Sequence, residues 1–290
     1  MMKKNILLIV NPVSGGLGKA DYVRAAKNFV SNKEINLVLY KTTGIDDLEK
    51  IRELYSGFKP ERIIIAGGDG TIKLVADAVA TKDVILGILP AGSANGLAVE
   101  LDLLKTIEEN LEIAFHHDYL EIDMVVINGR KSLHLSDIGL NAELIKNYKK
   151  SKNHGKWGYF VQALKTFVKT PKPFRVTIET SSTRIETEAR MIVIANAQKY
   201  GTGVVINPLG TLNDGKFELV VLKKISLGVL SKIIIGNLPL VHKDIQIIST
   251  NAATIKTNFP VGFQIDGEYI GRENELSVSI YSEKMKVAVP

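Results

Sequence analysis

The sequence predicts an α/β domain with a parallel sheet, followed by a mainly β, sandwich-like domain. Up to about Glu121, apolar runs rich in β-branched residues alternate with helical segments, and this rhythm indicates parallel strands joined by right-handed crossovers. Beyond Glu121, short strands separated by turn residues dominate, as is typical of a sandwich. We therefore expect domains at residues 1–121 and 122–290, with the last strand either remaining in the second domain or returning to the first.

The first domain is expected to contain four strand–helix pairs. An apolar β-branched run predicts a strand that is buried on both faces, as in a parallel sheet. The expected strands cover residues 4–10, 35–40, 62–66 and 84–89, and the expected helices cover residues 20–30, 46–55, 72–80 and 94–101. Because such sheets bind ligands outside the carboxyl ends of their strands, the turns that follow the strands are the first candidates for a site.

The second domain is expected to begin with a hairpin around Asn128-Gly129, a dipeptide that favours a two-residue turn. Helical patterns follow at residues 141–149 and 157–169. The expected strands cover residues 122–127, 131–136, 174–180, 184–196, 216–222, 244–250, 253–257, 263–266 and 275–281.

The composition excludes several classes of function. The 290 residues include no cysteine, which rules out disulfides, thiol catalysis and thiolate metal sites. The apolar stretch at residues 6–10 is too short for a signal peptide, and no run approaches the length of a membrane span, so we expect a soluble, cytoplasmic protein. The net charge of +6 suits phosphate-rich ligands or an anionic membrane surface. Nucleic acid is not expected as a partner, because no dense Lys/Arg block with aromatic residues is present.

The turn after the third expected strand is the most informative segment of the chain. It consists of Gly67-Gly68-Asp69-Gly70-Thr71. Its glycines let the backbone turn sharply and approach a ligand, and Thr71 is placed to cap a helix that begins at Ile72, whose free N–H groups would bind an anion. A carboxylate repels phosphate, so we expect Asp69 to face a metal ion or a substrate hydroxyl. The alternative is a tight turn with Asp69 as a cap.

Two further turns follow strands in the same way. Residues 11–19 form a glycine-rich segment with Lys19 at its end, and residues 89–98 combine small residues with Ser93 and Asn95. Glycine-rich turns expose backbone N–H groups to phosphate. Ser93 is positioned to bond a phosphate oxygen, and Asn95 to tie the loop in place. Neither segment has the spacing of a Walker A or dinucleotide-binding motif.

Together, the Asn11-Pro12 turn, Gly67–Thr71 and residues 92–98 resemble the diacylglycerol kinase/sphingosine kinase-type lipid kinases, in their bacterial YegS-like branch. The resemblance extends to Asp123 and to the segments 213–217 and 266–268. It implies a phosphofructokinase/NAD kinase-like N-terminal domain and ATP-dependent transfer of the γ-phosphoryl group to a lipid hydroxyl, with a diacylglycerol or sphingoid-type acceptor. Because the glycine-rich turn also occurs in NAD kinases, a kinase of a soluble acceptor and a non-catalytic nucleotide-binding regulator are the alternatives.

The resemblance also implies roles for individual residues and the cofactors ATP and Mg²⁺. Glu268 matches the family's general base, with Asp266 beside it, and Asp69 and Asp123 match acidic positions near the catalytic magnesium. Residues at nucleotide-binding positions or in the loops that carry them are Asn11, Thr42, Gly67, Gly68, Asp69, Gly70, Thr71, Gly92, Ser93 and Asn95. A structural magnesium is implied at Asp214, with Thr211 and Lys216 at the carbonyl positions.

This chain departs from the family pattern in two loops, and its acceptor is open. Asn95-Gly96 stands where the family often has Asn-Asp, and Asn213-Asp214 where many members have Asp-Asp, which indicates weaker metal binding. Glu143 aligns with an acid that sphingoid-base kinases use near the substrate amine, the alternative being a solvated acid at a helix start. Apolar residues between 157 and 168, flanked by lysines, indicate either a packed helix or a gate that touches anionic membrane. We expect contact with the inner face of the membrane during turnover. A homodimer is left open.

Overall fold

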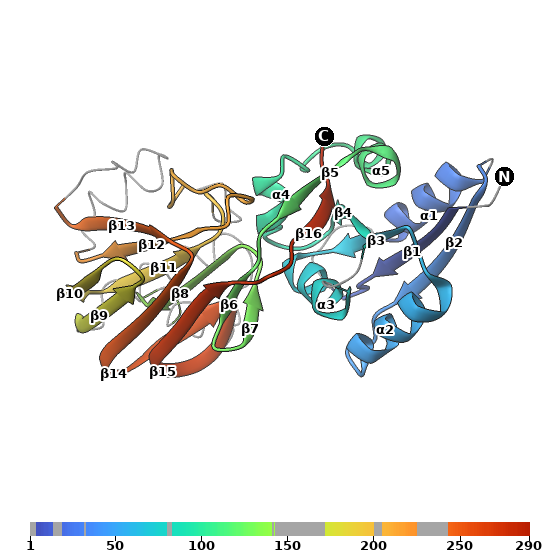
Figure 1. Ribbon diagram of the computed structural model, residues 1–290. Helices are drawn as coiled ribbons and strands as arrows, with labels where there is room; N and C mark the ends of the chain where they lie inside the picture. Colours follow the sequence, from blue (N-terminus) through green and yellow to red (C-terminus); the bar gives the residue numbers. More distant parts are fainter. Residues whose placement is uncertain are drawn as a thin grey trace. The chain divides into compact units, whose positions relative to one another are not determined.

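The computed structural model describes residues 4–13, 19–31, 33–79, 83–140, 142, 172–199, 205–224 and 243–290. The chain separates into two compact units (Figure 1). The N-terminal unit contains the described residues up to Ile122 together with those from Ser282 to Pro290, and the C-terminal unit contains those from Asp123 to Tyr281. A parallel sheet in the first and a β-rich sandwich in the second confirm the predicted fold class.

The described residues of the N-terminal unit form a six-stranded sheet in the order β2-β1-β3-β4-β16-β5. Its strands are β1 (Lys4–Val10), β2 (Ile35–Lys41), β3 (Arg62–Gly67), β4 (Ile85–Pro90), β5 (Tyr119–Ile122) and β16 (Met285–Ala288). All pair in parallel except β5, which runs antiparallel to β16. The strands β1, β3 and β4 are apolar runs, as expected for strands inside a parallel sheet. They are accordingly buried along most of their length.

Helices cover this sheet, and their apolar residues form its core. They are α1 (Lys19–Val30), α2 (Asp47–Phe58), α3 (Asp69–Val79), α4 (Gly96–Glu100) and α5 (Ile107–His116). α1 contacts α5, whereas α2 contacts α3. The core beneath α1 and α5 joins Leu8 and Ile64 of the strands to Tyr22 and Phe115 of these helices.

α5 is a helix that the sequence analysis missed. A capping box begins it: the Thr106 hydroxyl accepts from the Glu109 backbone N–H, while the Glu109 carboxylate accepts from the Thr106 N–H. At Gly87 of β4 a Cβ would lie 2.7 Å from the Cβ of Ala114, so the absence of a side chain there lets α5 approach the sheet closely. The Thr-x-x-Glu spacing was the signal in the sequence that marks this start.

The described residues of the C-terminal unit form an antiparallel sheet in the order β13-β12-β11-β8-β14-β15-β6-β7, and β9 pairs with both β14 and β10. The strands are β6 (Val125–Ile127), β7 (Arg130–Ser132), β8 (Leu135–Gly139), β9 (Phe174–Thr180), β10 (Arg184–Ala189), β11 (Met191–Ala195), β12 (Phe217–Leu222), β13 (Ile245–Thr250), β14 (Ala252–Ile265) and β15 (Glu268–Ile280).

The long strand β14 joins the two layers of the sandwich. Its first part pairs with β9 and its last part with β8, and its register against β15 shifts between Lys256 and Val261. A bulge of this kind bends a strand and lets it serve two sheets. The apolar residues between the layers form one cluster that includes Phe174 of β9, Phe217 of β12 and Phe263 of β14.

Several expected strands of this unit are corrected by the structure. Residues 253–257 and 263–266 belong to one strand, β14, and β15 begins at Glu268 rather than residue 275. The expected strand 184–196 is two strands, β10 and β11, because Arg190 separates them. The expected helices at residues 141–149 and 157–169 lie outside the described residues except for Ala142.

Candidate active site

The turn between β3 and α3 is built tightly around glycine. β3 ends at Gly67 and α3 begins at Asp69, so Gly68 alone joins them. A Cβ on Gly67 would lie 2.6 Å from the Thr71 side chain, and the Thr71 N–H donates to the Gly68 carbonyl at 2.9 Å. The expected helix start at Ile72, with Thr71 as its cap, is therefore wrong. The helix begins earlier because the glycine-rich segment itself adopts helical geometry.

The same turn lies against the loop that follows β4. A Cβ on Gly68 would lie 2.9 Å from the Gly92 Cα, and a Cβ on Gly92 would overlap the Gly68 Cα. The Asn95 side chain closes the second loop on itself, since its Oδ1 accepts from the Gly92 N–H at 2.8 Å and its Nδ2 donates to the Gly92 carbonyl at 3.1 Å. Asn95 therefore ties the loop, as its place in the sequence suggests.

Asp69 connects the two turns. Its Oδ2 accepts from the Gly96 N–H at 2.8 Å and its Oδ1 from the Leu97 N–H at 3.0 Å. These N–H groups belong to the first turn of α4, where a negative charge is favourable. The sequence analysis weighed Asp69 as a cap of its own turn but did not foresee that it holds the start of another helix. Each carboxylate oxygen keeps a further lone pair for a second partner.

The loops after β1 and β2 bring two more candidate residues to this end of the sheet. Asn11 Nδ2 donates to the Thr71 hydroxyl at 3.1 Å, so the first turn is joined to the third. Thr42 is buried, and its N–H donates to the Val10 carbonyl at 2.9 Å. Gly70 and Ser93 are exposed.

Partly buried hydrogen bonds fix the loop around Thr42. The Asp47 carboxylate accepts from the Tyr40 hydroxyl at 2.6 Å and from the N–H groups of Thr43 and Gly44 at 2.9 and 2.7 Å. Burial opposes ionisation of Asp47, but these donors outweigh it and hold its pKa below the ordinary value. Burial and then the Asp47 carboxylate raise the pKa of Tyr40 to about 12.

In the C-terminal unit, Asp123 is buried against the loop at residues 211–216. Its Oδ2 accepts from the Gly215 N–H at 2.6 Å, and its own N–H donates to the Leu212 carbonyl at 2.6 Å. Gly215 has a φ of +73°, which favours glycine. The structure thus brings Asp123 together with the loop that carries the three predicted metal residues, a neighbour that the sequence analysis did not assign to it.

That loop offers few side-chain ligands for a metal. Asp214 is exposed and accepts from the Lys216 N–H at 3.0 Å. Within the described ranges, no group of three or more His, Cys, Asp or Glu residues is placed to hold a metal ion. One carboxylate with the Thr211 and Lys216 carbonyls fits Mg²⁺, because this ion keeps several of its waters, and fits a transition metal poorly.

Asp266 lies in the tight turn between β14 and β15, and Glu268 directly follows this turn. Asp266 and Gly267 have φ values of +46° and +82°, as in a type I′ turn. The Asp266 carboxylate is fully engaged: Oδ1 accepts from the Ser132 hydroxyl and the His134 N–H, both at 3.0 Å, and Oδ2 from the Leu133 N–H at 2.9 Å. Glu268 begins β15 and is exposed. Asp266 therefore anchors the turn that presents Glu268.

Two residues near this hairpin were missed by the sequence analysis. Asp137 of β8 and Gln264 of β14 are cross-strand partners that are buried, with 0% and 1% of their surface exposed. The signal in the sequence was a polar residue within an apolar strand, in Leu135–Gly139 and in the end of β14. Such a residue interrupts the strand pattern and needs a partner.

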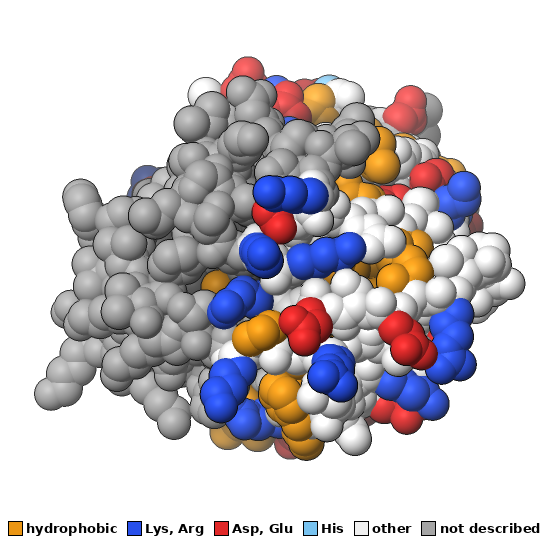
Figure 2. All heavy atoms as spheres, turned by 90° about the vertical axis from the view of Figure 1, so that its left-hand side faces the viewer, with side chains coloured by type: hydrophobic (Ala, Val, Ile, Leu, Met, Phe, Trp, Pro, Cys, Tyr) orange, Lys and Arg blue, Asp and Glu red, His pale blue; other side chains and the backbone are white. Residues whose placement is uncertain are grey.

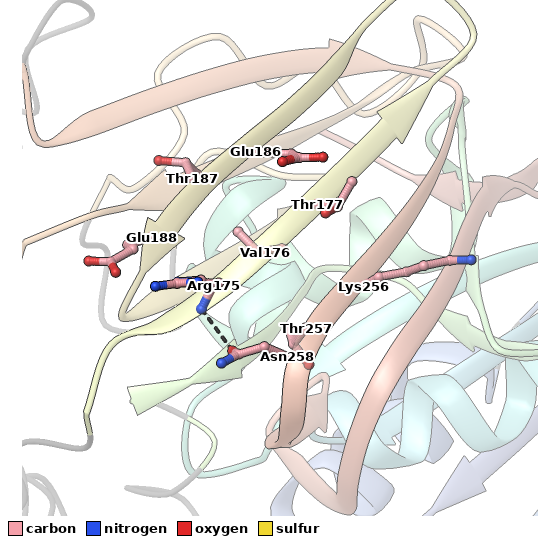
Figure 3. A pocket seen from close by; sticks show the side chains of 9 residues that line it. All are labelled: Arg175, Val176, Thr177, Glu186, Thr187, Glu188, Lys256, Thr257 and Asn258. Carbon is pink, nitrogen blue, oxygen red and sulfur yellow. Dashed lines mark hydrogen bonds between the residues drawn. The ribbon is translucent and has the colours of Figure 1, made fainter.

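A pocket of about 460 Å³ lies elsewhere in the C-terminal unit (Figure 3). It is formed by β9, β10 and β14, and the Arg175 N–H donates to Asn258 Oδ1 at 2.9 Å within it. Its lining residues are Arg175, Val176, Thr177, Glu186, Thr187, Glu188, Lys256, Thr257 and Asn258. None of them is a predicted site residue, so this pocket is separate from the candidate site residues of the described chain.

Charged side chains of both signs are spread over the face of the C-terminal unit that Figure 2 shows. Glu143 and the lysine-flanked apolar segment at residues 157–168 lie outside the described residues. No helix of the described residues is both long and apolar enough to cross a membrane.

Two family models together account for most of the chain. Residues 5–127 match the diacylglycerol kinase catalytic domain, and residues 137–289 match the YegS C-terminal NAD kinase beta sandwich-like domain. The chain belongs to the family of kinases that these two domains define. Membership in this family implies the use of ATP.

A named relative agrees with this family, and two solved structures share the fold. The "Diacylglycerol kinase" of Bacillus subtilis (strain 168) is 29% identical over 231 residues, which are 76% of this chain and 75% of the relative. A putative diacylglycerol kinase from Bacillus anthracis str. Sterne shares the fold with a TM-score of 0.83 at 23% identity, over 99% of this chain and 97% of that one. An NAD kinase from Archaeoglobus fulgidus in complex with ATP has a TM-score of 0.56 at 11% identity, over 98% and 93%.

Proposed function

We propose that the protein transfers the γ-phosphoryl group of ATP to the hydroxyl of a lipid, with diacylglycerol or a sphingoid-type lipid as acceptor. The observation that supports this best is the interlocked pair of loops at Gly68 and Gly92, which Asp69 ties to the start of α4. Two glycine-rich loops in close backbone contact at the carboxyl ends of parallel strands suit the phosphates of a nucleotide. The names of the relatives supply the class of acceptor.

The residues of the N-terminal unit would bind and orient the nucleotide. Asn11 and Thr71 would hold the first and third turns around the phosphates, and the exposed Ser93 would donate to a phosphate oxygen. Because phosphoryl transfer depends mainly on positioning and on electrostatic stabilisation, rigid loops of this kind contribute directly to the rate. Mg²⁺, when bound, would neutralise the charge that develops on the phosphate oxygens.

Glu268 would act on the acceptor. The lipid hydroxyl oxygen forms a bond to the γ-phosphorus while the bond to the β,γ-bridging oxygen breaks and ADP leaves. The hydroxyl proton passes to the Glu268 carboxylate, which is exposed and therefore reachable by a substrate. An ordinary carboxylate suffices, because the proton is lost late in a loose transition state.

The test is transfer of labelled γ-phosphate from ATP, with Mg²⁺, into an organic-extractable product. Diacylglycerol, sphingosine and a total lipid extract would be offered separately, with NAD as a soluble acceptor in a parallel reaction. Label in a lipid supports the proposal, and the mass of the product identifies the acceptor. Label in NADP, or ATP binding with no transfer to any acceptor, would instead favour the soluble-acceptor kinase or the regulator.

We also propose transient association with anionic membrane, because a net charge of +6 favours such surfaces. Co-sedimentation with vesicles of phosphatidylcholine, with and without phosphatidylglycerol, measures this. Binding that needs the anionic lipid and weakens with salt is the expected result. Equal binding to both kinds of vesicle would show that the positive charge of the protein does not drive the association.

A further inference from the structure

A buried carboxylate–amide pair supports the hairpin that presents Glu268. Gln264 Nε2 donates to Asp137 Oδ2 at 2.5 Å, and Gln264 Oε1 accepts from the Gly267 N–H at 2.7 Å. The two bonds form a continuous path from β8, through a side chain of β14, to the backbone of the turn. Gly267 is adjacent to Glu268 in the chain, so the path ends one residue from the proposed general base.

The chemistry of the two groups determines which atom of the Gln264 amide faces Asp137 and which faces Gly267. An ionised carboxylate only accepts hydrogen bonds, so the Gln264 amide must turn its NH₂ group towards Asp137. Its oxygen is then necessarily the atom that faces the Gly267 N–H. Asp137 thereby selects one of the two orientations of the Gln264 amide, and only that orientation can hold the turn.

Stability alone does not explain a polar pair at this place. Asp137 and Gln264 are both buried, and Asp137 is also the cross-strand partner of the buried Val193 of β11. Burying a charge costs several kcal/mol before its partners repay it, and well-packed apolar residues would often serve stability equally well. Buried polar pairs are better explained where one precise geometry is needed.

The turn is clamped at both of its residues. The Asp266 carboxylate holds it to the loop at Leu133 and His134, while the Gly267 N–H is held by Gln264. Glu268 itself has an exposed side chain, so its position depends on the backbone that precedes it. A displacement of about 1 Å at a reacting group can cost on the order of 100-fold in rate.

We propose that Asp137 and Gln264 are positioning residues: they fix the backbone at Gly267 so that the Glu268 carboxylate meets the acceptor hydroxyl. This inference rests on the proposed role of Glu268 as the general base. In this proposal neither residue contacts the substrate. Both act through the turn.

The experiment replaces the amide by a carboxylate and then restores the pair in reverse. In Gln264→Glu, two carboxylates would face each other, and their repulsion would displace the side chain whose other oxygen accepts from the Gly267 N–H. Adding Asp137→Asn to that variant reverses the polarity of the native pair: the amide now at position 137 donates to the carboxylate now at position 264, whose other oxygen accepts from the Gly267 N–H. Asp137→Asn alone keeps an oxygen that can accept from Gln264, so among the three variants it should have the mildest effect on kcat.

The readouts are kcat, KM for ATP, and hydrogen exchange of the Gly267 amide in the whole protein. We expect Gln264→Glu to lower kcat at least about tenfold, to leave KM for ATP within about twofold because the nucleotide loops are unaltered, and to accelerate exchange at Gly267. The double variant should recover kcat and amide protection to within about threefold of the native protein. If Gln264→Glu does not fold, Gln264→Met, which removes the acceptor without adding charge, takes its place.

The matched control is Asn128→Ala. Asn128 and Gly129 form a second hairpin in the same unit with φ values of +47° and +77°, and Asn128 braces it through the Ser277 N–H and the Glu275 carbonyl. We expect this variant to loosen its own turn without changing kcat. A double variant no better than Gln264→Glu, or faster exchange at Gly267 with unchanged kcat, would overturn the inference. If the native protein phosphorylates no lipid, the proposed function fails, whereas the exchange data still decide whether the pair holds the turn.

Discussion

Asp69 combines a structural role with its proposed role near the nucleotide. Its two oxygens accept from the Gly96 and Leu97 N–H groups, so the carboxylate is fixed before any ligand binds. A fixed charge needs no reorganisation when the reaction occurs, which is the main advantage of a preorganised site. Substitution of this residue therefore changes both the fold around α4 and the electrostatics of the loops.

Asp69→Asn should lower turnover by about a hundredfold or more and destabilise the protein by about 1 kcal/mol, because one amide N–H group would face a backbone donor at the start of α4. Labelled-phosphate transfer and thermal unfolding measure the two effects. Asp102→Asn is the control, since Asp102 is exposed and its ion pair with Lys105 lies at the surface. Full activity in Asp69→Asn would show that the charge serves the helix start alone.

Glu268→Gln tests the proposed general base. We expect kcat to fall by about 10²–10⁴-fold, with ATP affinity and melting temperature unchanged, because an amide cannot accept the proton and the exposed side chain supports little of the fold. Glu275→Gln, on the same strand, removes an exposed ion pair with Lys256 and should leave kcat unaltered. Near-native turnover in Glu268→Gln would remove this residue from the role.

The Tyr40–Asp47 pair makes stability depend on pH at both extremes. The pKa of Tyr40 is raised to about 12, above that of the unfolded chain, so its contribution is complete below about pH 10 and is lost as the pH rises towards 12. The pKa of Asp47 is lowered, so its contribution is present above about pH 4 and is lost in acid. Chemical unfolding of Tyr40→Phe should lack the alkaline part of this loss, and an unchanged alkaline slope would contradict the assignment.

At the scale of elements, the site depends on two loops that can meet only through glycine. A Cβ on Gly92 would overlap Gly68, which lies after another strand. Gly92→Ala should therefore abolish ATP binding or reduce it by at least about tenfold, as measured by calorimetry, because the loops must separate. Gly57→Ala is the matched control: no atom lies within 4 Å of the added methyl group in α2, and helix propensity predicts a gain of about 0.5–1 kcal/mol.

The strands that could be predicted from the sequence are those that one uninterrupted apolar run specifies. β1 and β3 are each one apolar run, and the predicted bounds match within a residue. β14 could not be predicted as one strand, because Lys256 and Pro260 interrupt its apolar pattern and only pairing with two other strands keeps the chain extended there. In the same way, the residue types at Asp69 and Asp266 marked a site, but their backbone partners lie 27 and more than 130 residues away.

At the scale of the whole molecule, the N-terminal sheet is completed by a distant part of the chain. β16 lies between β4 and β5 (Figure 1), and Val287 is fully buried there. Val287→Asp should therefore destabilise the N-terminal unit by about 3 kcal/mol or more, because it places an unpaired charge in a sheet interior. Loss of ATP binding together with a lower melting temperature is expected, with the exposed Ser282→Ala as control. Unchanged ATP binding would show that β16 is dispensable to the nucleotide loops.

The position of β16 also constrains how the molecule acquires its structure during synthesis. Residues 4–122 leave the ribosome long before residue 285, yet the place between β4 and the edge strand β5 is filled only by residues 285–288. Until then both neighbouring strands present unpaired edges, which are prone to wrong pairing. The C-terminal unit, whose strands lie between these segments, can complete its own pairing first. The N-terminal unit therefore begins first on the ribosome and is finished last.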